Sequence, residues 1–178
     1  MSKVVIVSSS IRGGSNSEAL ARAAANGAKA AGHEVTEISL KGKTIGFCKG
    51  CLACQRTLKC VIADDANEIA ETVKNADTVV FATPIYYYEM SGQLKTLLDR
   101  MNSLYPSEYC FRNIYMMTVA AAEDDNTPLK AVNGLQGWVD CFTKAELKGN
   151  IFFGGLTDSN GVTDDDIKRA EEFGSHLD

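Results

Sequence analysis

The stretch VVIVSSSIRGGSNS, residues 4–17, decides the fold of this chain. It opens with four β-branched apolar residues, which are typical of a strand buried on both faces. A loop of hydroxyl, arginine and glycine residues follows and leads into an alanine-rich helix, predicted from about Asn16 to Ala31. Gly32 stands where a helix of this length would stop. A buried strand joined directly to a helix indicates the α/β class.

The same alternation of short apolar blocks and helical patterns continues along the rest of the chain. Five strands alternating with five helices predict one parallel sheet covered on both faces, because parallel neighbours need crossover connections. The third strand is expected to break at Thr83-Pro84, and Asp64 or Asp65 is expected to cap the second helix. The expected strands are residues 4–8, 35–40, 78–82, 114–120 and 150–153, and the expected helices are residues 16–31, 65–74 and 91–104, one that starts after Thr127-Pro128, and one that starts at Thr163.

Length and composition indicate one ordinary globular domain over residues 1–178. Apolar residues make up 45% of the chain and charged residues 23%, which argues against disorder. The formal net charge is −5, and without clustered Lys and Arg we expect no nucleic-acid partner. No apolar run approaches the roughly 18 to 20 residues of a membrane span, and no signal peptide is recognisable. We therefore expect a cytoplasmic protein.

The loop of residues 8–17 has the composition of a phosphate site. Hydroxyls, the Arg12 guanidinium and the amide groups at a helix N-terminus all favour a bound anion. The alternative is an ordinary helix cap, because Ser15 and Glu18 have the spacing of a capping box. Neither a P-loop nor a Gly-x-Gly-x-x-Gly motif is present. The loop therefore suits a compact terminal phosphate better than a pyrophosphate.

Three consecutive tyrosines, Tyr86, Tyr87 and Tyr88, lie in the segment 83–92 that follows the third strand. Consecutive residues of a strand face opposite sides, so at least one of these rings lies outside the core. One interpretation is a flat heteroaromatic ring stacked on this loop, and the other is a subunit contact. In parallel sheets, ligands bind beyond the carboxyl ends of the strands, where this loop and the first loop meet.

Four cysteines, Cys48, Cys51, Cys54 and Cys60, have the spacing C-x2-C-x2-C-x5-C. Four thiolates on a compact loop can ligate a [4Fe–4S] cube. Zinc is the chemical competitor, and free thiols or a disulfide are the remaining alternatives. Cys110 and Cys141 lie in apolar contexts and are expected in or near the core.

These motifs resemble those of the flavodoxin-like NAD(P)H-dependent FMN reductases, and within them the iron-sulfur flavoproteins. The family's first loop has the pattern Gly-Ser-Pro-Arg followed by Gly-Asn-Thr, and Ser9 to Arg12 and Ser15 to Ser17 stand in the same order. Its second loop has the pattern Pro-Ile-Tyr, then Ser-Gly-Gln-Leu-Lys and Asp-Arg. Pro84 to Tyr86, Ser91 to Lys95 and Asp99-Arg100 match it. This chain departs from the pattern at Ile11, Ser9, Ser15 and Tyr88-Glu89.

The resemblance implies a three-layer flavodoxin-like sandwich with strand order 2-1-3-4-5 and a single FMN-binding domain. It implies an FMN-dependent oxidoreductase that takes electrons from NAD(P)H and passes them to a quinone, a flavin or a protein. The alternative is a non-enzymatic electron carrier or redox sensor. No side chain is assigned acid–base catalysis, since the cofactor performs the chemistry, and a homodimer or tetramer is expected. FMN would be held at its phosphate by Ser10, Arg12, Ser15, Asn16 and Ser17 and along its isoalloxazine by Pro84, Ile85, Tyr86 and Tyr87.

Overall fold

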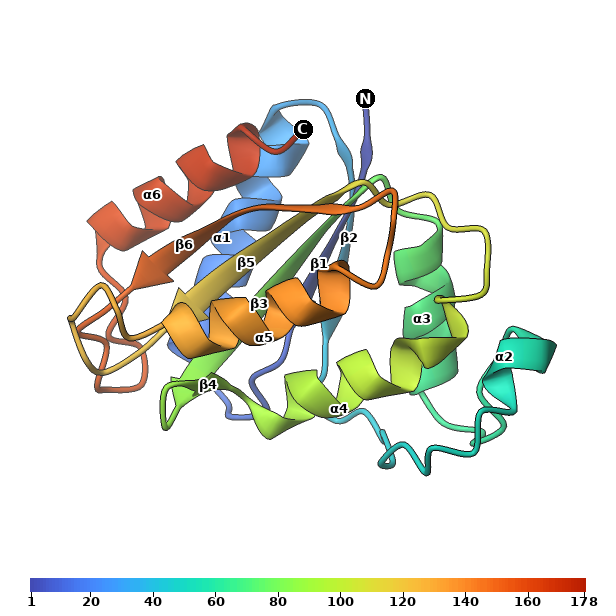
Figure 1. Cartoon of the computed structure of the whole chain (residues 1–178). Coiled ribbons are helices and arrows are strands. Elements are labelled where there is room, and N and C mark those ends of the chain that lie inside the picture. Colours follow the sequence, from blue (N-terminus) through green and yellow to red (C-terminus); the bar gives the residue numbers. More distant parts are fainter.

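The computed structural model describes the whole chain, residues 1–178, as a sheet between two layers of helices (Figure 1). The parallel strands are β1 (Lys3–Ser8), β2 (Glu34–Ser39), β3 (Thr78–Tyr86), β5 (Asn113–Val119) and β6 (Glu146–Phe153). They lie in the order β2-β1-β3-β5-β6, which confirms the expected order of the five principal strands. Parallel pairing brings the carboxyl ends of β1, β3, β5 and β6 to one edge of the sheet.

The prediction of five strands is one too few. A short strand, β4 (Glu89–Met90), folds back and pairs antiparallel with the end of β3. The expected break at Thr83-Pro84 is also wrong, because β3 continues to Tyr86. Beyond Ala82, β3 pairs with β5 and no longer with β1. Proline is tolerated there, since its missing N–H lies on a locally unpaired side of the strand.

Helices cover both faces of the sheet, as expected (Figure 1). The helices are α1 (Asn16–Ala30), α2 (Cys54–Thr57), α3 (Ala66–Lys74), α4 (Gly92–Arg100), α5 (Leu129–Val139) and α6 (Asp164–Ser175), with a 3-10 turn η1 (Met101–Ser103). One buried cluster joins α1 and α6 to the sheet, and a second joins α3, α4 and α5 to it. The short α2 stands away from both layers in Figure 1. None of these helices is both long enough and apolar enough to span a membrane.

The layer of α1 and α6 depends on two glycines. A Cβ on Gly27 would lie 1.9 Å from the carbonyl oxygen of Glu171, and a Cβ on Gly174 would lie 1.9 Å from that of Ala24. The two backbones therefore approach more closely than any side chain would allow. This contact fixes the direction of α1 and hence the position of its N-terminus at the carboxyl edge of the sheet.

Candidate functional site

One pocket of about 230 Å³ opens at the carboxyl edge of the sheet. Its walls come from the loop after β1 with the start of α1, from the ends of β3 and β5, and from the residues that follow β5 and β6. Of the nine residues predicted to hold the flavin, eight line this pocket, and Tyr87 does not. The eight are Ser10, Arg12, Ser15, Asn16, Ser17, Pro84, Ile85 and Tyr86. Two segments far apart in the sequence therefore meet in one cavity.

Ser15 joins the pocket to the start of α1. It is the N-cap residue, and its Oγ accepts a hydrogen bond from the amide of Glu18 at 3.2 Å. The helix cap considered from sequence is therefore present, and it coexists with a place in the pocket wall. Exposed amide groups at this helix end carry a partial positive charge. Arg12 is the single charged residue of the lining, and no carboxylate lies there, so the pocket suits an anion.

Asn16 holds the far wall of the pocket in place. Its side-chain amide donates to the carbonyl of Asp158 at 2.8 Å and accepts from the amide of Gly161 at 3.0 Å. Asn160 donates to the carbonyl of Gly14 at 3.3 Å in the same region. The segment after β6 is thereby tied to the first loop. The sequence predicted that the side-chain amide of Asn16 binds the ligand. In the structure, that amide holds the segment after β6 instead.

Buried hydroxyls connect the first loop to the tyrosine segment. Ser9 Oγ donates to the carbonyl of Ala82 at 3.1 Å, and Ser91 Oγ lies 2.9 Å from Ser9 Oγ. The amide of Ser91 donates to Thr83 Oγ1 at 3.0 Å. These three side chains are fully buried. Such a satisfied network rigidifies the two loops relative to each other.

The tyrosine segment is a tight hairpin between β3 and β4. Tyr87 and Tyr88 form its turn with φ of 50° and 67°, a conformation that turns of this kind reserve mainly for Asn and Gly. The turn leaves Tyr87 98% exposed, whereas the Tyr88 ring lies under Lys130 of α5, with Nζ 5.6 Å from its centroid. Tyr86 remains in the pocket wall. The predicted contact of Tyr87 with the same cavity is absent within this single chain.

Two parts of the pocket were missed by sequence reasoning. The loop after β5 contributes Val119, Ala120 and Ala121, and the segment after β6 contributes Leu156 and Thr157. Small residues at the end of the strand predicted over residues 114–120 are a weak sequence signal for the first part. No motif marks the second part, because its place depends on the hydrogen bonds of Asn16.

All four clustered cysteines line a second, smaller cavity of about 20 Å³, together with Asp99, Arg100 and Asn102. Left-handed backbone at Gly50, Leu52 and Leu58 folds the loop around it. Cys54 is buried, Cys60 is half-buried, and Cys48 and Cys51 are exposed. All six cysteines are free thiols. No group of three or more His, Cys, Asp or Glu side chains is arranged to hold a single metal ion.

An ion pair anchors the two ends of the cysteine loop. Arg100 binds both carboxylate oxygens of Asp64, at 2.6 and 2.8 Å, and both side chains are buried. Asp64 also accepts from the amides of Gly46 and Ala66. Burial disfavours its charged form, but the hydrogen bonds from Arg100, Gly46 and Ala66 outweigh this and hold the pKa of Asp64 below its ordinary value. Asp65 is the N-cap residue of α3 but makes no side-chain cap; it binds the amide of Thr44 instead.

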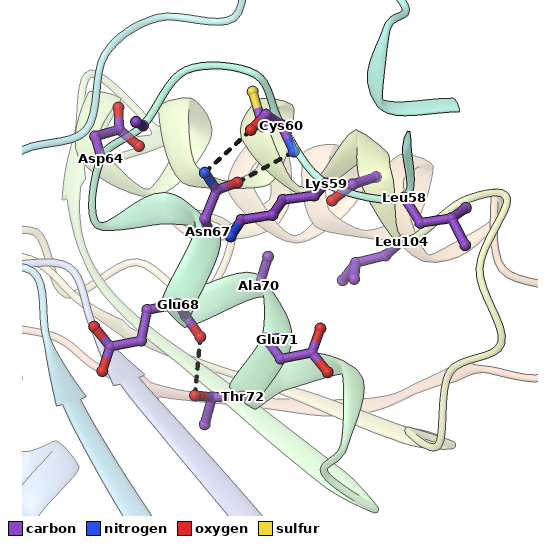
Figure 2. Close-up of a pocket in the computed structure, with 12 residues that line it drawn as sticks. Leu58, Lys59, Cys60, Asp64, Asn67, Glu68, Ala70, Glu71, Thr72 and Leu104 are labelled. Atoms are coloured by element: carbon purple, nitrogen blue, oxygen red, sulfur yellow. Dashed lines mark hydrogen bonds between the residues drawn. The ribbon is translucent and has the colours of Figure 1, made fainter. Parts of the chain in front are cut away.

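Asn67 of α3 clamps the fourth cysteine (Figure 2). Its side-chain amide accepts from the Cys60 amide at 3.2 Å and donates to the Cys60 carbonyl at 3.1 Å. A surface cavity of about 880 Å³ lies beside this clamp and carries three carboxylates, Asp64, Glu68 and Glu71. It is larger than the two cavities described above, but of the residues predicted to bind flavin or metal it contains only Cys60.

The expectation that Cys110 and Cys141 lie in or near the core is wrong for these two side chains, because both are exposed. Cys110 stands between Tyr109 and Phe111, and Cys141 precedes Phe142. The three aromatic rings pack against one another, with Tyr109 and Phe111 centroids 4.4 Å apart. The apolar context around both cysteines belongs to these rings, which occupy the inward positions.

Comparison with known proteins concerns the family and the fold of this chain. The sequence pattern of the family described as NADPH-dependent FMN reductase matches residues 2–153. An iron-sulfur flavoprotein of Methanosarcina thermophila is 30% identical over 156 residues, covering 87% of this chain and 82% of that protein. An iron-sulfur flavoprotein of Methanocaldococcus jannaschii is 39% identical over 102 residues. That match covers 57% of this chain and 53% of the relative, so the chain matches only about half of that protein's length.

Among solved structures, the fold is shared with an NAD(P)H:quinone oxidoreductase from Methanothermobacter marburgensis. The TM-score is 0.72 at 16% sequence identity, and the match covers 98% of each chain. At this identity the likeness concerns the fold alone. It confirms the three-layer arrangement around the sheet.

Proposed function

The chain belongs to the NADPH-dependent FMN reductase family and is an FMN-dependent oxidoreductase, and we propose that the pocket at the carboxyl edge of the sheet is its flavin site. The observation that supports this assignment is the meeting of the first loop and the tyrosine hairpin in one cavity with no carboxylate in its lining. When bound, FMN supplies hydride and electron transfer. The protein binds the flavin, orients its ring and limits access of water.

The phosphate end of the pocket is the first loop. Hydroxyls of Ser10, Ser15 and Ser17, the amide groups at the start of α1 and the Arg12 guanidinium would hold the phosphate. Asn16 would act by holding the opposite wall, as its hydrogen bonds indicate. The small side chains of Ala120 and Ala121 leave the backbone open to the edge of a flat ring beside Pro84 to Tyr86.

We propose NAD(P)H as the electron donor and a quinone, a free flavin or a protein as the acceptor. The test is anaerobic mixing of the FMN-loaded protein with NADH or NADPH while the flavin absorbance is followed. Bleaching within one turnover time is expected. Bound FMN that neither nucleotide bleaches would overturn the reductase assignment in favour of an electron carrier or redox sensor.

We further propose that Cys48, Cys51, Cys54 and Cys60 ligate a [4Fe–4S] cluster. Convergence of four thiols on one cavity supports it, and the donor set is the one such clusters use. The cytoplasm, where thiols stay reduced, is the compartment such a loop requires. Anaerobically purified protein should contain iron and acid-labile sulfide, Cys54→Ser should lose both, and Cys141→Ser should retain them. Wild-type protein free of iron would refute the cluster.

Finally, we propose that a second copy of the chain covers the tyrosine hairpin. Tyr86, Tyr87 and Tyr88 are 54%, 98% and 56% exposed, and large exposed aromatic rings beside a binding site are typical of an interface. A homodimer or tetramer in which Tyr87 completes a partner's pocket would explain why it lines no cavity in one chain. Light scattering on the FMN-loaded protein tests this assembly.

A further inference from the structure

Arg100 is the last residue of α4, and one N–H donor of its guanidinium has no hydrogen-bond partner. Its side chain is fully buried. Nη1 donates to Asp64 Oδ2 at 2.6 Å and to the Gly46 carbonyl at 2.8 Å, and Nη2 donates to Asp64 Oδ1 at 2.8 Å and to the Ile62 carbonyl at 3.1 Å. The remaining donor, Nε–H, is buried and has no partner. A buried charged group rarely leaves a donor unsatisfied, because the donor loses its bond to water and gains none in return.

The side chain of Arg100 lies next to the four-cysteine site. Arg100 lines the small cavity of the four cysteines. The pKa of Arg100 is raised above its ordinary value, first by the hydrogen bond to Asp64 and then, against the effect of burial, by the neighbouring Cys60 side chain. Asn102, two residues further on, lines the same cavity and places its Nδ2 3.4 Å from Cys54 Sγ. One donor, Asn102 Nδ2, therefore contacts a cysteine sulfur. A second donor, Arg100 Nε–H, is buried without a partner on a residue that lines the same cavity.

Resting on the cluster proposed above, we infer that Arg100 and Asn102 are positioning residues that donate hydrogen bonds to the sulfur atoms of the four-cysteine site. Arg100 supplies its unpaired Nε–H to the cavity that the four cysteines line, and Asn102 donates to Cys54. Both stabilise negative charge on sulfur. Reduction adds one electron to the site, so both residues raise its reduction potential, which depends on net charge and on hydrogen bonds to sulfur.

Substitution of Asp64 should shift the reduction potential in the opposite direction to substitution of Arg100 or Asn102, and this contrast tests the inference. Its carboxylate holds Arg100 and partly cancels its charge. Asp64→Asn keeps the shape but removes the negative charge, so it should raise the potential, whereas Arg100→Gln and Asn102→Leu should lower it. A purely structural role would move all three variants in the same direction, because each would loosen the same loop.

The experiment is an anaerobic redox titration of the holoprotein, in which the cluster is followed by its absorbance and the bound FMN serves as an internal reference. We expect at least a tenfold change in the equilibrium constant for Arg100→Gln, which is about 59 mV for one electron. Arg56→Gln is the matched control. It removes an equal charge from the exposed surface of the same loop, where solvent screens it, and it should shift the potential much less.

The outcomes separate this inference from the cluster proposal. Wild-type protein without iron would overturn the cluster and this inference with it. Iron-loaded variants whose potentials equal the wild-type value, or all shift in one direction, would overturn the inference alone. If Arg100→Gln fails to fold, as loss of bound FMN would reveal, the opposite shifts of Asp64→Asn and Asn102→Leu still decide it.

Discussion

Ser15 and Ser17 differ in what their hydroxyl groups do. Both side chains line the proposed flavin pocket, but only Ser15 caps α1. A hydroxyl that caps a helix contributes to the stability of the folded chain, whereas one that faces only the ligand contributes to binding. The two roles can therefore be distinguished by matched substitutions two residues apart.

Ser17→Ala should weaken FMN binding at least tenfold and leave the thermal stability of the apoprotein nearly unchanged. The reason is that a hydrogen bond to a charged group is worth about 1.5–3 kcal/mol. Ser15→Ala should weaken binding as well and should also cost about 1 kcal/mol of folding free energy through the lost cap. Flavin fluorescence titration and denaturant unfolding measure the two quantities. Equal stability losses in both variants would contradict this division.

The ion pair between Asp64 and Arg100 makes folding sensitive to acid. The pKa of Asp64 lies below its ordinary value of 3.8 in the folded chain. Its contribution to stability is therefore fully present above 3.8 and is lost as the pH falls through the lower, folded value. Asp64→Asn should be less stable by about 3 kcal/mol at neutral pH, since it breaks a buried pair. The two proteins should converge in urea unfolding as the pH falls below 3.8. A constant difference down to acid pH would contradict this account.

At the scale of elements, the β3–β4 hairpin is held in an unfavourable conformation. Tyr87 and Tyr88 both have positive φ, which costs a residue with a Cβ about 1–2 kcal/mol. Strain of this kind persists where the side chain serves a purpose that glycine cannot. Exposure of Tyr87 at the mouth of the site agrees with the proposal that it contacts a second copy.

Tyr87→Gly should raise the stability of the apoprotein by about 1 kcal/mol, because glycine adopts positive φ without strain. The same change should weaken FMN binding or self-association, measured by fluorescence titration and light scattering. Tyr105→Gly is the control, since Tyr105 is also exposed but has no positive φ, and it should give no gain in stability. A destabilised Tyr87→Gly with unchanged binding would show that the ring has only a structural role.

The contact of α1 with α6 is the second element that depends on unusual residues. Gly27→Ala should destabilise the fold by about 1–3 kcal/mol, although alanine is the better helix former, because its Cβ would lie 1.9 Å from the Glu171 carbonyl oxygen. Gly137→Ala in α5 is the matched control. Nothing lies within 4 Å of a Cβ there, so it should gain up to about 1 kcal/mol. Thermal unfolding of both variants measures the contrast, and equal effects would argue against this close approach.

At the scale of the whole molecule, FMN in the proposed pocket would contact segments at the ends of four strands. FMN at a hundredfold excess over its dissociation constant should stabilise the chain by about 2.7 kcal/mol. For a chain of 178 residues this corresponds to a rise of about 5–10 °C in the melting temperature. Riboflavin, which lacks the phosphate, should give a clearly smaller rise at the same concentration. Equal shifts from the two ligands would place the binding energy outside the first loop.

Much of this architecture could be predicted from the sequence, because its signals are local. Hydrophobic periodicity located β1 and α1, and the capping box at Thr163 marked the start of α6 correctly. The continuation of β3 through Pro84 could not be predicted in this way, since it depends on where β1 ends beside it. The return strand β4 was missed because its turn uses two tyrosines, where the usual signal is Asn-Gly.

By itself, the sequence determined the class of fold, the order of its principal strands, the two segments that meet in the proposed flavin pocket and the set of four cysteines. Each of these follows from residue type and spacing within one segment. Only the tertiary structure decided which side chains remain available to a ligand. Asn16 is engaged by the segment after β6, and Tyr87 is exposed and does not line the pocket. Nε of Arg100 is left unpartnered on a residue that lines the cysteine cavity. The partner of each hydrogen-bonding group depends on which groups lie near it in space. Packing brings together segments that are distant in the sequence, so these partners could not be predicted from local sequence patterns.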